Sequence, residues 1–263
     1  MKNLKNVSVW MVLMLLFVAG VKAQTVIPSK KYITREVKNA SNFSAIKVLG
    51  SPDVEYRQSN NSKTTVSIYG SDNLVDLLEV NTVNGVLQVN IKKGVNIHGG
   101  ERRLKVIASS PSLTQVDIQG SADVYLNGAI KGTDLRLNVM GSGDIDAENL
   151  NYTDISVAVK GSGDVVLKNM KVDKLNAEVA GSGDIDMRGT AQRAVLTVNG
   201  SGDISAGNLV ANNVSATVSG SGDIECYASK QLDARVGGSG DIEYKGNPSV
   251  VNKEGRKDQI SKK

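Results

Sequence analysis

Six aspartates recur within one short motif, and they are the residues of this sequence best placed to do chemistry. The string GSGDI occurs five times and GSGDV once, so every copy supplies one serine and one carboxylate at a fixed position. The first glycine and the aspartate of the six copies are Gly141 and Asp144, Gly161 and Asp164, Gly181 and Asp184, Gly200 and Asp203, Gly220 and Asp223, and Gly238 and Asp241. Such a series could form a repeated cation site, a set of catalytic acids, or a repeated piece of backbone geometry.

A calcium site needs more ligands than this repeat offers. Ca²⁺ takes six to eight oxygen ligands, and the known calcium-binding β-roll repeats about every nine residues. Here the repeat is about twice as long and contributes a single aspartate. We therefore predict no metal site, and a calcium-stabilised repeat protein stays open as an alternative.

The six aspartates are also poorly suited to catalysis. Acid–base chemistry uses two groups in different environments, whereas the six aspartates share one sequence context. The only histidine, His98, lies in the predicted loop NIHGG, and Cys226 is the only cysteine. No GxSxG, HExxH or P-loop motif is present. We predict no catalytic residues, no cofactor and no enzyme; a polysaccharide-active enzyme on the same fold is the alternative.

Backbone geometry explains the motif more simply. Glycine adopts positive φ and permits close approach of neighbouring chains, and Ser and Asp side chains hydrogen-bond the free amides of turns. We interpret the twelve glycines and aspartates as a structural turn ladder. Ser142, Ser162 and Ser182 are expected to donate hydrogen bonds to its carboxylates.

The elements that must position this ladder repeat with the same period. Successive motif glycines are 20, 20, 19, 20 and 18 residues apart. Before Gly161, the apolar residues Ile155, Val157 and Val159 alternate with polar or small ones, and every copy shows the same pattern. A second short alternation follows each motif, and a third apolar residue such as Leu150 often comes three residues later. This alternation is typical of strands with one buried face.

A fixed period near twenty residues indicates stacked units that cannot bury their apolar faces alone. We therefore predict an all-β protein, a parallel β-helix (β-solenoid) with rungs of about 20 residues and GSGD turns. An antiparallel sandwich or barrel is the alternative. Cys226 shares its repeat position with Ala206 and Met187, so we interpret it as a core packing residue.

The domain organisation follows from where the repeat is regular. We predict a lead-in at 24–40 and one solenoid domain at 41–245, with an irregular start or cap at 41–110 and regular repeats at 111–245. Residues 246–263 are predicted to form a final cap and a basic tail. Within the irregular part, the sequence predicts a hairpin at Asn84-Gly85.

The first 23 residues have the pattern of a secretory signal peptide. Lys2 and Lys5 precede an apolar stretch, and VKA ends at Ala23. The leader contains three lysines, so its removal lowers the formal net charge from +4 to +1. No basic face indicates nucleic-acid binding, and no transmembrane segment is expected after cleavage. We predict an exported protein that is periplasmic, surface-associated or secreted.

The strings FSAIKVLGSPDVEYRQ, LQVNIKK and PSLTQVDIQGSADV, followed by serial GSGDI, resemble the GIN-domain family of autotransporter adhesin heads. The resemblance covers roughly residues 40 to 245. It implies an exported bacterial protein with a β-helix-like fold, and it carries no catalytic residues to transfer. We therefore expect a non-enzymatic, adhesin-like binding or scaffold protein whose partner is a protein or glycan surface.

Overall fold

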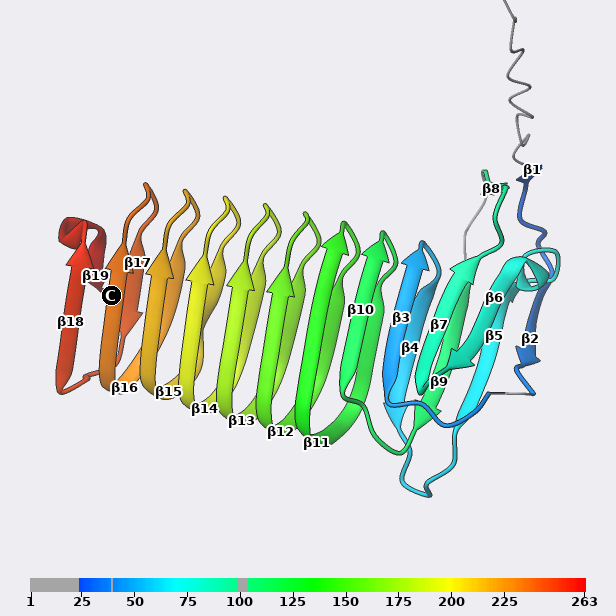
Figure 1. The fold of residues 1–263 in the computed structure, drawn as a ribbon, viewed down its shortest axis with the longest axis horizontal. Helices are drawn as coiled ribbons and strands as arrows, with labels where there is room; N and C mark the ends of the chain where they lie inside the picture. Colours follow the sequence, from blue (N-terminus) through cyan, green and yellow to red (C-terminus); the bar gives the residue numbers. More distant parts are fainter. Residues whose placement is uncertain (1–23, 39, 99–103) are drawn as a thin grey trace, which may run out of the picture.

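Among the described residues, nearly all regular structure is β-strand. The computed structural model describes residues 24–38, 40–98 and 104–263. Within those ranges there is no α-helix, and the two helical elements are single 3-10 turns, η1 (Val75–Leu77) and η2 (Lys257–Gln259). The strands stack in parallel along one axis into an elongated solenoid (Figure 1). The predicted all-β parallel solenoid is confirmed.

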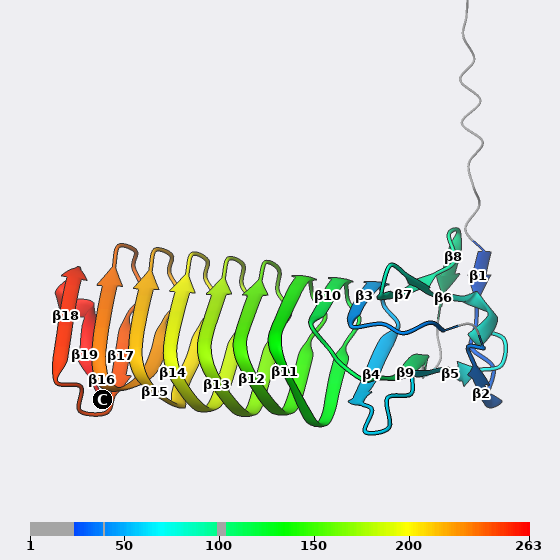
Figure 2. The ribbon, with the colours of Figure 1, turned by 60° about the horizontal axis from the view of Figure 1, so that its bottom comes forward.

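The regular part of the solenoid is made of six long strands, each pairing in parallel with the next. They are β11 (Val124–Gly141), β12 (Ile145–Val159), β13 (Val165–Val179), β14 (Ile185–Val198), β15 (Ile204–Val218) and β16 (Ile224–Val236). Each strand begins after one Gly-Ser turn and ends at the next, so one strand wraps a whole rung (Figure 2).

Each rung has three sides, because the in–out alternation breaks twice along the strand. In β12 the buried side chains form three groups: Ile145 and Ala147, Leu150 and Tyr152, and Ile155, Val157 and Val159. The sequence pattern predicted only one inward residue on the middle side. The structure adds Tyr152, whose hydroxyl donates a hydrogen bond to the carbonyl of Leu113 (2.8 Å).

Equivalent buried residues lie directly above one another and form the core. One such ladder contains Ile145, Val165, Ile185, Ile204, Ile224 and Ile242, each at most 1% exposed. Burying an aliphatic side chain contributes about 1.5–3 kcal/mol. Cys226 is buried in register with Ala206 and Tyr244, as a packing residue would be.

The first rung in the sequence is not the first rung in space. Strands β3 (Ala45–Gly50) and β4 (Asp53–Gln58) pair on one side with β10 (Gln115–Gly120) and β11. On the other side they pair with β7 (Val86–Ile91) and β9 (Lys105–Ser110). The chain therefore leaves the solenoid after β4, builds its end, and returns to stack on β3.

Antiparallel strands cover that end. Strand β6 (Leu78–Val83) pairs with β7, and Asn84 (φ 50°) and Gly85 (φ 76°) form the turn between them, so the predicted hairpin is confirmed. Strand β5 (Thr65–Ser71) pairs antiparallel with β9, and β2 (Tyr32–Glu36) pairs antiparallel with β5. The short strands β1 (Gln24–Val26) and β8 (Val95–Ile97) pair with each other. These elements protect strand edges that an open rung would expose.

At the other end, residues 246–263 form a further rung. After β17 (Ile242–Lys245), strand β18 (Val250–Gly255) stacks on β16 and β19 (Ile260–Lys262) stacks on β17. Lys253 takes a core-facing position next to Ala234, and its Nζ donates to the carbonyl of Ile260 (2.6 Å). A charged side chain in this position disfavours the addition of another strand.

The predicted signal peptide, residues 1–23, lies outside the described residues. Among those that are described, no helix is long and apolar enough to span a membrane.

Candidate functional site

The GSGD turns stack in a row along one edge of the solenoid, between its first and last sides (Figure 1). A Cβ atom added to the first glycine of any of the six copies would lie 1.9–2.1 Å from a carbonyl oxygen of the preceding rung. Of these six glycines, only Gly141 has φ in the left-handed region, at +146°. Glycine is therefore required here because the rungs approach closely. The expectation that these glycines adopt positive φ is wrong for the five later copies.

The amides of each turn are bonded to the rung before. In the turn at Gly161, the amides of Ser162 and Gly163 both donate to the carbonyl of Gly141, at 2.8 and 3.2 Å. The next amide, of Asp164, donates to the carboxylate Oδ1 of Asp144 at 2.8 Å. One carboxylate oxygen thus supplies the acceptor that the backbone does not.

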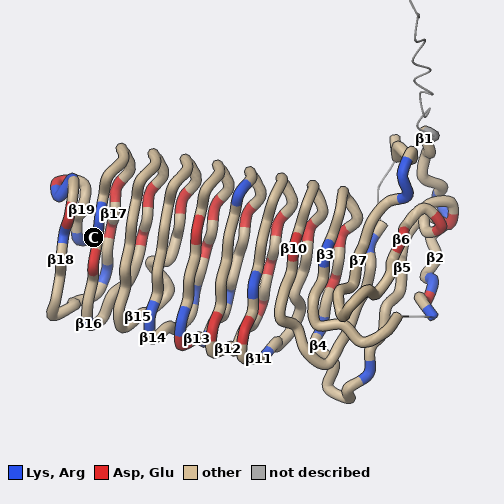
Figure 3. Tube along the Cα trace, viewed as in Figure 1, with Lys and Arg blue, Asp and Glu red and all other residues tan. Residues whose placement is uncertain are grey.

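The same contact repeats along the whole edge. The Oδ1 atoms of Asp164, Asp184, Asp203 and Asp223 accept the amides of the following aspartates at 2.7–2.8 Å, so all six motif aspartates form one column. Asp53 and Asp123, from the related strings GSPDV and GSADV, extend it. The acidic residues of the turns are visible in Figure 3. In the described chain, no hydrogen bond joins the hydroxyl of Ser142, Ser162 or Ser182 to this column, so that expectation is wrong.

His98 and Cys226, the only histidine and the only cysteine of the sequence, lie far apart. His98 is exposed beside β8, and Cys226 is buried in β16 near the opposite end (Figure 1). Burial raises the pKa of the Cys226 thiol to about 12. No group of three or more His, Cys, Asp or Glu residues able to hold a metal is present in the described ranges.

A different set of residues forms an extended hollow on the side of the solenoid that precedes the turns. Three adjoining hollows, of about 580, 440 and 560 Å³, share Arg193 and Val195 at one junction and Ser215 and Asp233 at the other. They follow one outward-facing column of the register, which we call the polar track: Gln115, Arg136, Ser156, Asn176, Val195, Ser215, Asp233 and Asn252.

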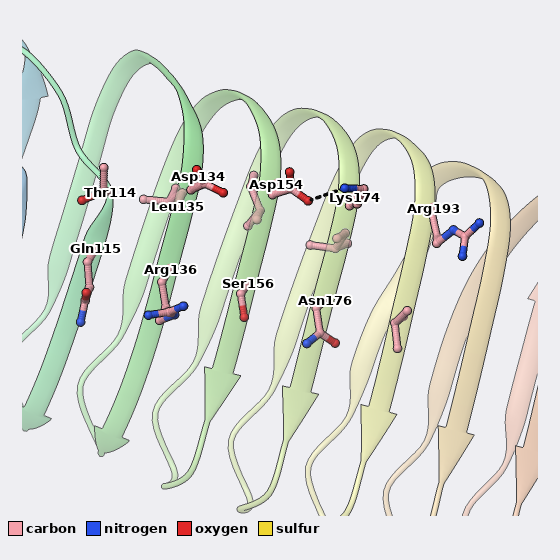
Figure 4. A pocket seen from close by; sticks show the side chains of 13 residues that line it. Thr114, Gln115, Asp134, Leu135, Arg136, Asp154, Ser156, Lys174, Asn176 and Arg193 are labelled. Atoms are coloured by element: carbon pink, nitrogen blue, oxygen red, sulfur yellow. Dashed lines mark ion pairs between the residues drawn. The ribbon is translucent and has the colours of Figure 1, made fainter.

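A second column flanks the first part of the polar track (Figure 4). Asp134, Asp154, Lys174 and Arg193 lie next to one another, so the charge changes sign along the solenoid. Nζ of Lys174 lies 3.5 Å from Oδ1 of Asp154. This mixture of charges contrasts with the uniform aspartate column of the turns.

Side chains at both ends of the polar track form hydrogen bonds, whereas, in the described part of the chain, those of Arg136 and Asn176 between them, and of Arg193 beside them, do not. Gln115 donates to Asp117 (2.6 Å), and Asn252 donates to Asp233 (2.6 Å). Within the described ranges, no hydrogen bond or ion pair engages the side chains of Arg136, Asn176 or Arg193. These side chains offer free donors and acceptors to a ligand on an open face.

The polar track was not predicted from the sequence, in which its positions stand out only as polar or small residues between the apolar ones. Aligning the repeats five residues before each motif glycine gives Arg136, Ser156, Asn176 and Val195. The variation among these residues, beside the invariant aspartates, is the signal that could have found it.

Comparison with known proteins assigns the chain to a family. The family model described as "Putative auto-transporter adhesin, head GIN domain" matches residues 42–168 and 147–248. The chain belongs to the GIN-domain family. Among curated proteins, none matches it significantly.

Solved structures of the same fold support this assignment. This GIN-domain protein is 34% identical to a putative adhesin from Bacteroides fragilis, over 90% of this chain and 96% of that one, with a TM-score of 0.68. It is 29% identical to a protein from Parabacteroides distasonis described as a putative lipid binding protein (91% and 100% covered, TM-score 0.82). A putative adhesin from Parabacteroides merdae is 25% identical (92% and 100% covered, TM-score 0.79).

Proposed function

We propose that this GIN-domain protein is an exported, non-enzymatic, adhesin-like binding protein that contacts its partner through the middle of the polar track. The observation that carries the proposal is the set of unengaged polar side chains on an open, elongated face: Arg136 and Asn176 of the track and Arg193 of the flanking column. The family and two of the solved relatives are described as putative adhesins, which supports the same function.

A polar, extended ligand suits this face. The track runs along the axis, across strands about 4.8 Å apart, so a linear polymer or a flat protein surface can contact several rungs at once. One relative is described as lipid binding. In the present chain the interior columns are filled by buried side chains, and we therefore propose a ligand that binds outside the core.

The turn ladder has a structural function in this proposal. The carboxylates of Asp144, Asp164, Asp184, Asp203 and Asp223 each satisfy a backbone amide of the next rung, and the glycines allow the rungs to approach. Export is the other part of the proposal. The intact mass of the protein from its native host should match a chain that starts at Gln24, and an uncleaved cytoplasmic protein would refute export.

A binding screen tests the contact surface. Residues 24–263 would be applied to an array of polysaccharides and extracellular proteins, beside the double variant Arg136→Gln, Arg193→Gln. The control is Lys160→Gln, Lys230→Gln, which removes two exposed cations outside the track. We expect saturable binding that the first pair weakens at least tenfold and the control retains. Equal binding by both pairs would refute the track as the contact surface.

A further inference from the structure

Three of the described tyrosines that are not buried, Tyr32, Tyr69 and Tyr125, lie where the solenoid meets its antiparallel end. Tyr69 and Tyr125 line one hollow of about 670 Å³, and Tyr32 stacks on Tyr69 with ring centroids 6.0 Å apart. Three other tyrosines, Tyr56, Tyr152 and Tyr244, are buried in the core. This hollow lies on the side that follows the turns, whereas the polar track lies on the side that precedes them.

The strand register fixes how the hollow is built. Across strands β5, β9, β4 and β11 (Figure 2), one outward row contains Tyr69, Lys105, Asp53 and Asp123, and the next contains Ser67, Ile107, Glu55 and Tyr125. The two tyrosines stand at opposite ends, three strand intervals apart, which is about 14 Å. Between them lie carboxylates, one amine and the exposed side chain of Ile107.

The polar groups of the hollow are held in place. Nζ of Lys105 donates to Oε1 of Glu55 at 2.6 Å and lies 5.5 Å from the centre of the Tyr69 ring. Oδ1 of Asp53 accepts the amide of Asp123 at 3.0 Å. Burial raises the pKa of the Asp53 carboxyl. These contacts leave a second oxygen on each carboxylate for a ligand.

Aromatic faces beside fixed hydrogen-bonding groups suit a ligand with one apolar face and many hydroxyls. A pyranose ring presents C–H groups to an aromatic ring and hydroxyls to carboxylates and amines. Tyr125 and Ile107 are 38% and 39% exposed and offer the apolar contacts. A basic peptide fits less well, because Lys105 already occupies the centre of the hollow and pairs with Glu55.

We propose that the hollow between Tyr69 and Tyr125 is a binding site for a short neutral oligosaccharide. The sugar chain lies across β9 and β4, with one end residue stacked on the exposed ring of Tyr125, the other beside the edge of Tyr69, and its hydroxyls bonded to Asp53, Glu55 and Lys105. This inference rests on the proposed function as a binding protein and gives it a ligand class and a second site.

The test uses residues 24–263 and four neutral tetrasaccharide probes: β1,4-linked glucose, α1,4-linked glucose, β1,4-linked mannose and β1,4-linked N-acetylglucosamine. Calorimetry measures affinity, and saturation-transfer NMR detects sugar protons close to the protein. We expect at least one probe to bind saturably. Tyr125→Ala should weaken that binding about tenfold, and Tyr125→Phe, which keeps the ring, should retain most of it.

Tyr227→Ala is the matched control, because it removes a partly exposed tyrosine from β16, far from the hollow. It should leave the affinity unchanged. The proposal is overturned if no probe binds, or if Tyr125→Ala binds as tightly as the parent. Binding on the polysaccharide and protein array that depends on Arg136 and Arg193 but not on Tyr125 would overturn this site alone and leave the proposed function standing.

Discussion

A single carboxylate oxygen completes each turn of this solenoid. The turn amides of one rung find backbone acceptors on the rung before, except the aspartate amide, which bonds the preceding aspartate. The motif alone indicated that aspartate would bond a turn amide. That the amide belongs to the next rung depends on stacking, which no single repeat contains.

Replacing Asp184 by asparagine keeps this acceptor and removes one charge from the column. Oδ1 of Asp184 accepts the amide of Asp203 at 2.8 Å. We expect Asp184→Asn to unfold with a free energy within about 1 kcal/mol of the parent, because the hydrogen bond survives. Asp184→Ala should be the less stable variant, measured by urea denaturation. Millimolar Ca²⁺ that stabilises the parent but not Asp184→Asn would instead indicate a metal site, since a ligand of the folded state raises Tm.

Cys226 should be chemically silent in the folded protein. It is 1% exposed, and burial raises its pKa from 9.0 to about 12. The reactive species is the thiolate, so iodoacetamide at pH 8 should label the unfolded chain and leave the native chain unlabelled, as read by intact mass. Because the folded-state pKa is the higher one, the contribution of this thiol to stability should be lost as pH rises from 9 towards 12. Rapid native labelling would contradict the packing assignment.

At the scale of the elements, the alternation of side chains sets what each strand tolerates. Val179 is fully buried between Val159 and Val198 in the ladder, whereas its neighbour Glu178 points outward. Val179→Asp should destabilise the protein by several kcal/mol, because an unpaired charge enters the core. Glu178→Lys, which loses only a 3.2 Å hydrogen bond from Asn199, should change little. Equal losses of Tm would show that the register is wrong.

Two adjacent glycines provide a matched test of rung contact. A Cβ on Gly238 would lie 1.9 Å from the carbonyl oxygen of Gly220, whereas a Cβ on Gly237 would have its nearest neighbour at 3.9 Å. Gly238→Ala must therefore push two rungs apart and should lower Tm strongly. Gly237→Ala should be neutral or slightly stabilising, because it restricts the unfolded chain. Similar Tm values for the two variants would argue against close packing at the turns.

Strands and repeats were predictable from sequence because their signals are local. Alternation such as Ile155, Val157 and Val159 needs only neighbouring residues, and the Asn84-Gly85 hairpin needs only its own turn. The position of β3 and β4 between β7/β9 and β10/β11 was not predictable in this way. It depends on pairing between segments separated by a long excursion, and no repeat spacing records that pairing.

For the molecule as a whole, stacking turns single residues into continuous surfaces. One outward position per rung becomes the polar track, and Arg136, Asn176 and the flanking Arg193 come from three different rungs. Their placement could be found only once the repeats were aligned in register. The same stacking leaves this face open to solvent. An open face suits the binding of a partner better than it suits an enclosed active site.

The most direct test of this account is to recover the ligand after binding. The array-positive ligand would be immobilised, exposed to residues 24–263, eluted and analysed by mass spectrometry, with affinity measured in parallel by surface plasmon resonance. We predict that the ligand returns chemically unchanged and that Arg136→Gln, Arg193→Gln weakens binding at least tenfold while Lys160→Gln, Lys230→Gln does not. A cleaved ligand would identify an enzyme, and unchanged affinity in the track variant would place the binding surface elsewhere.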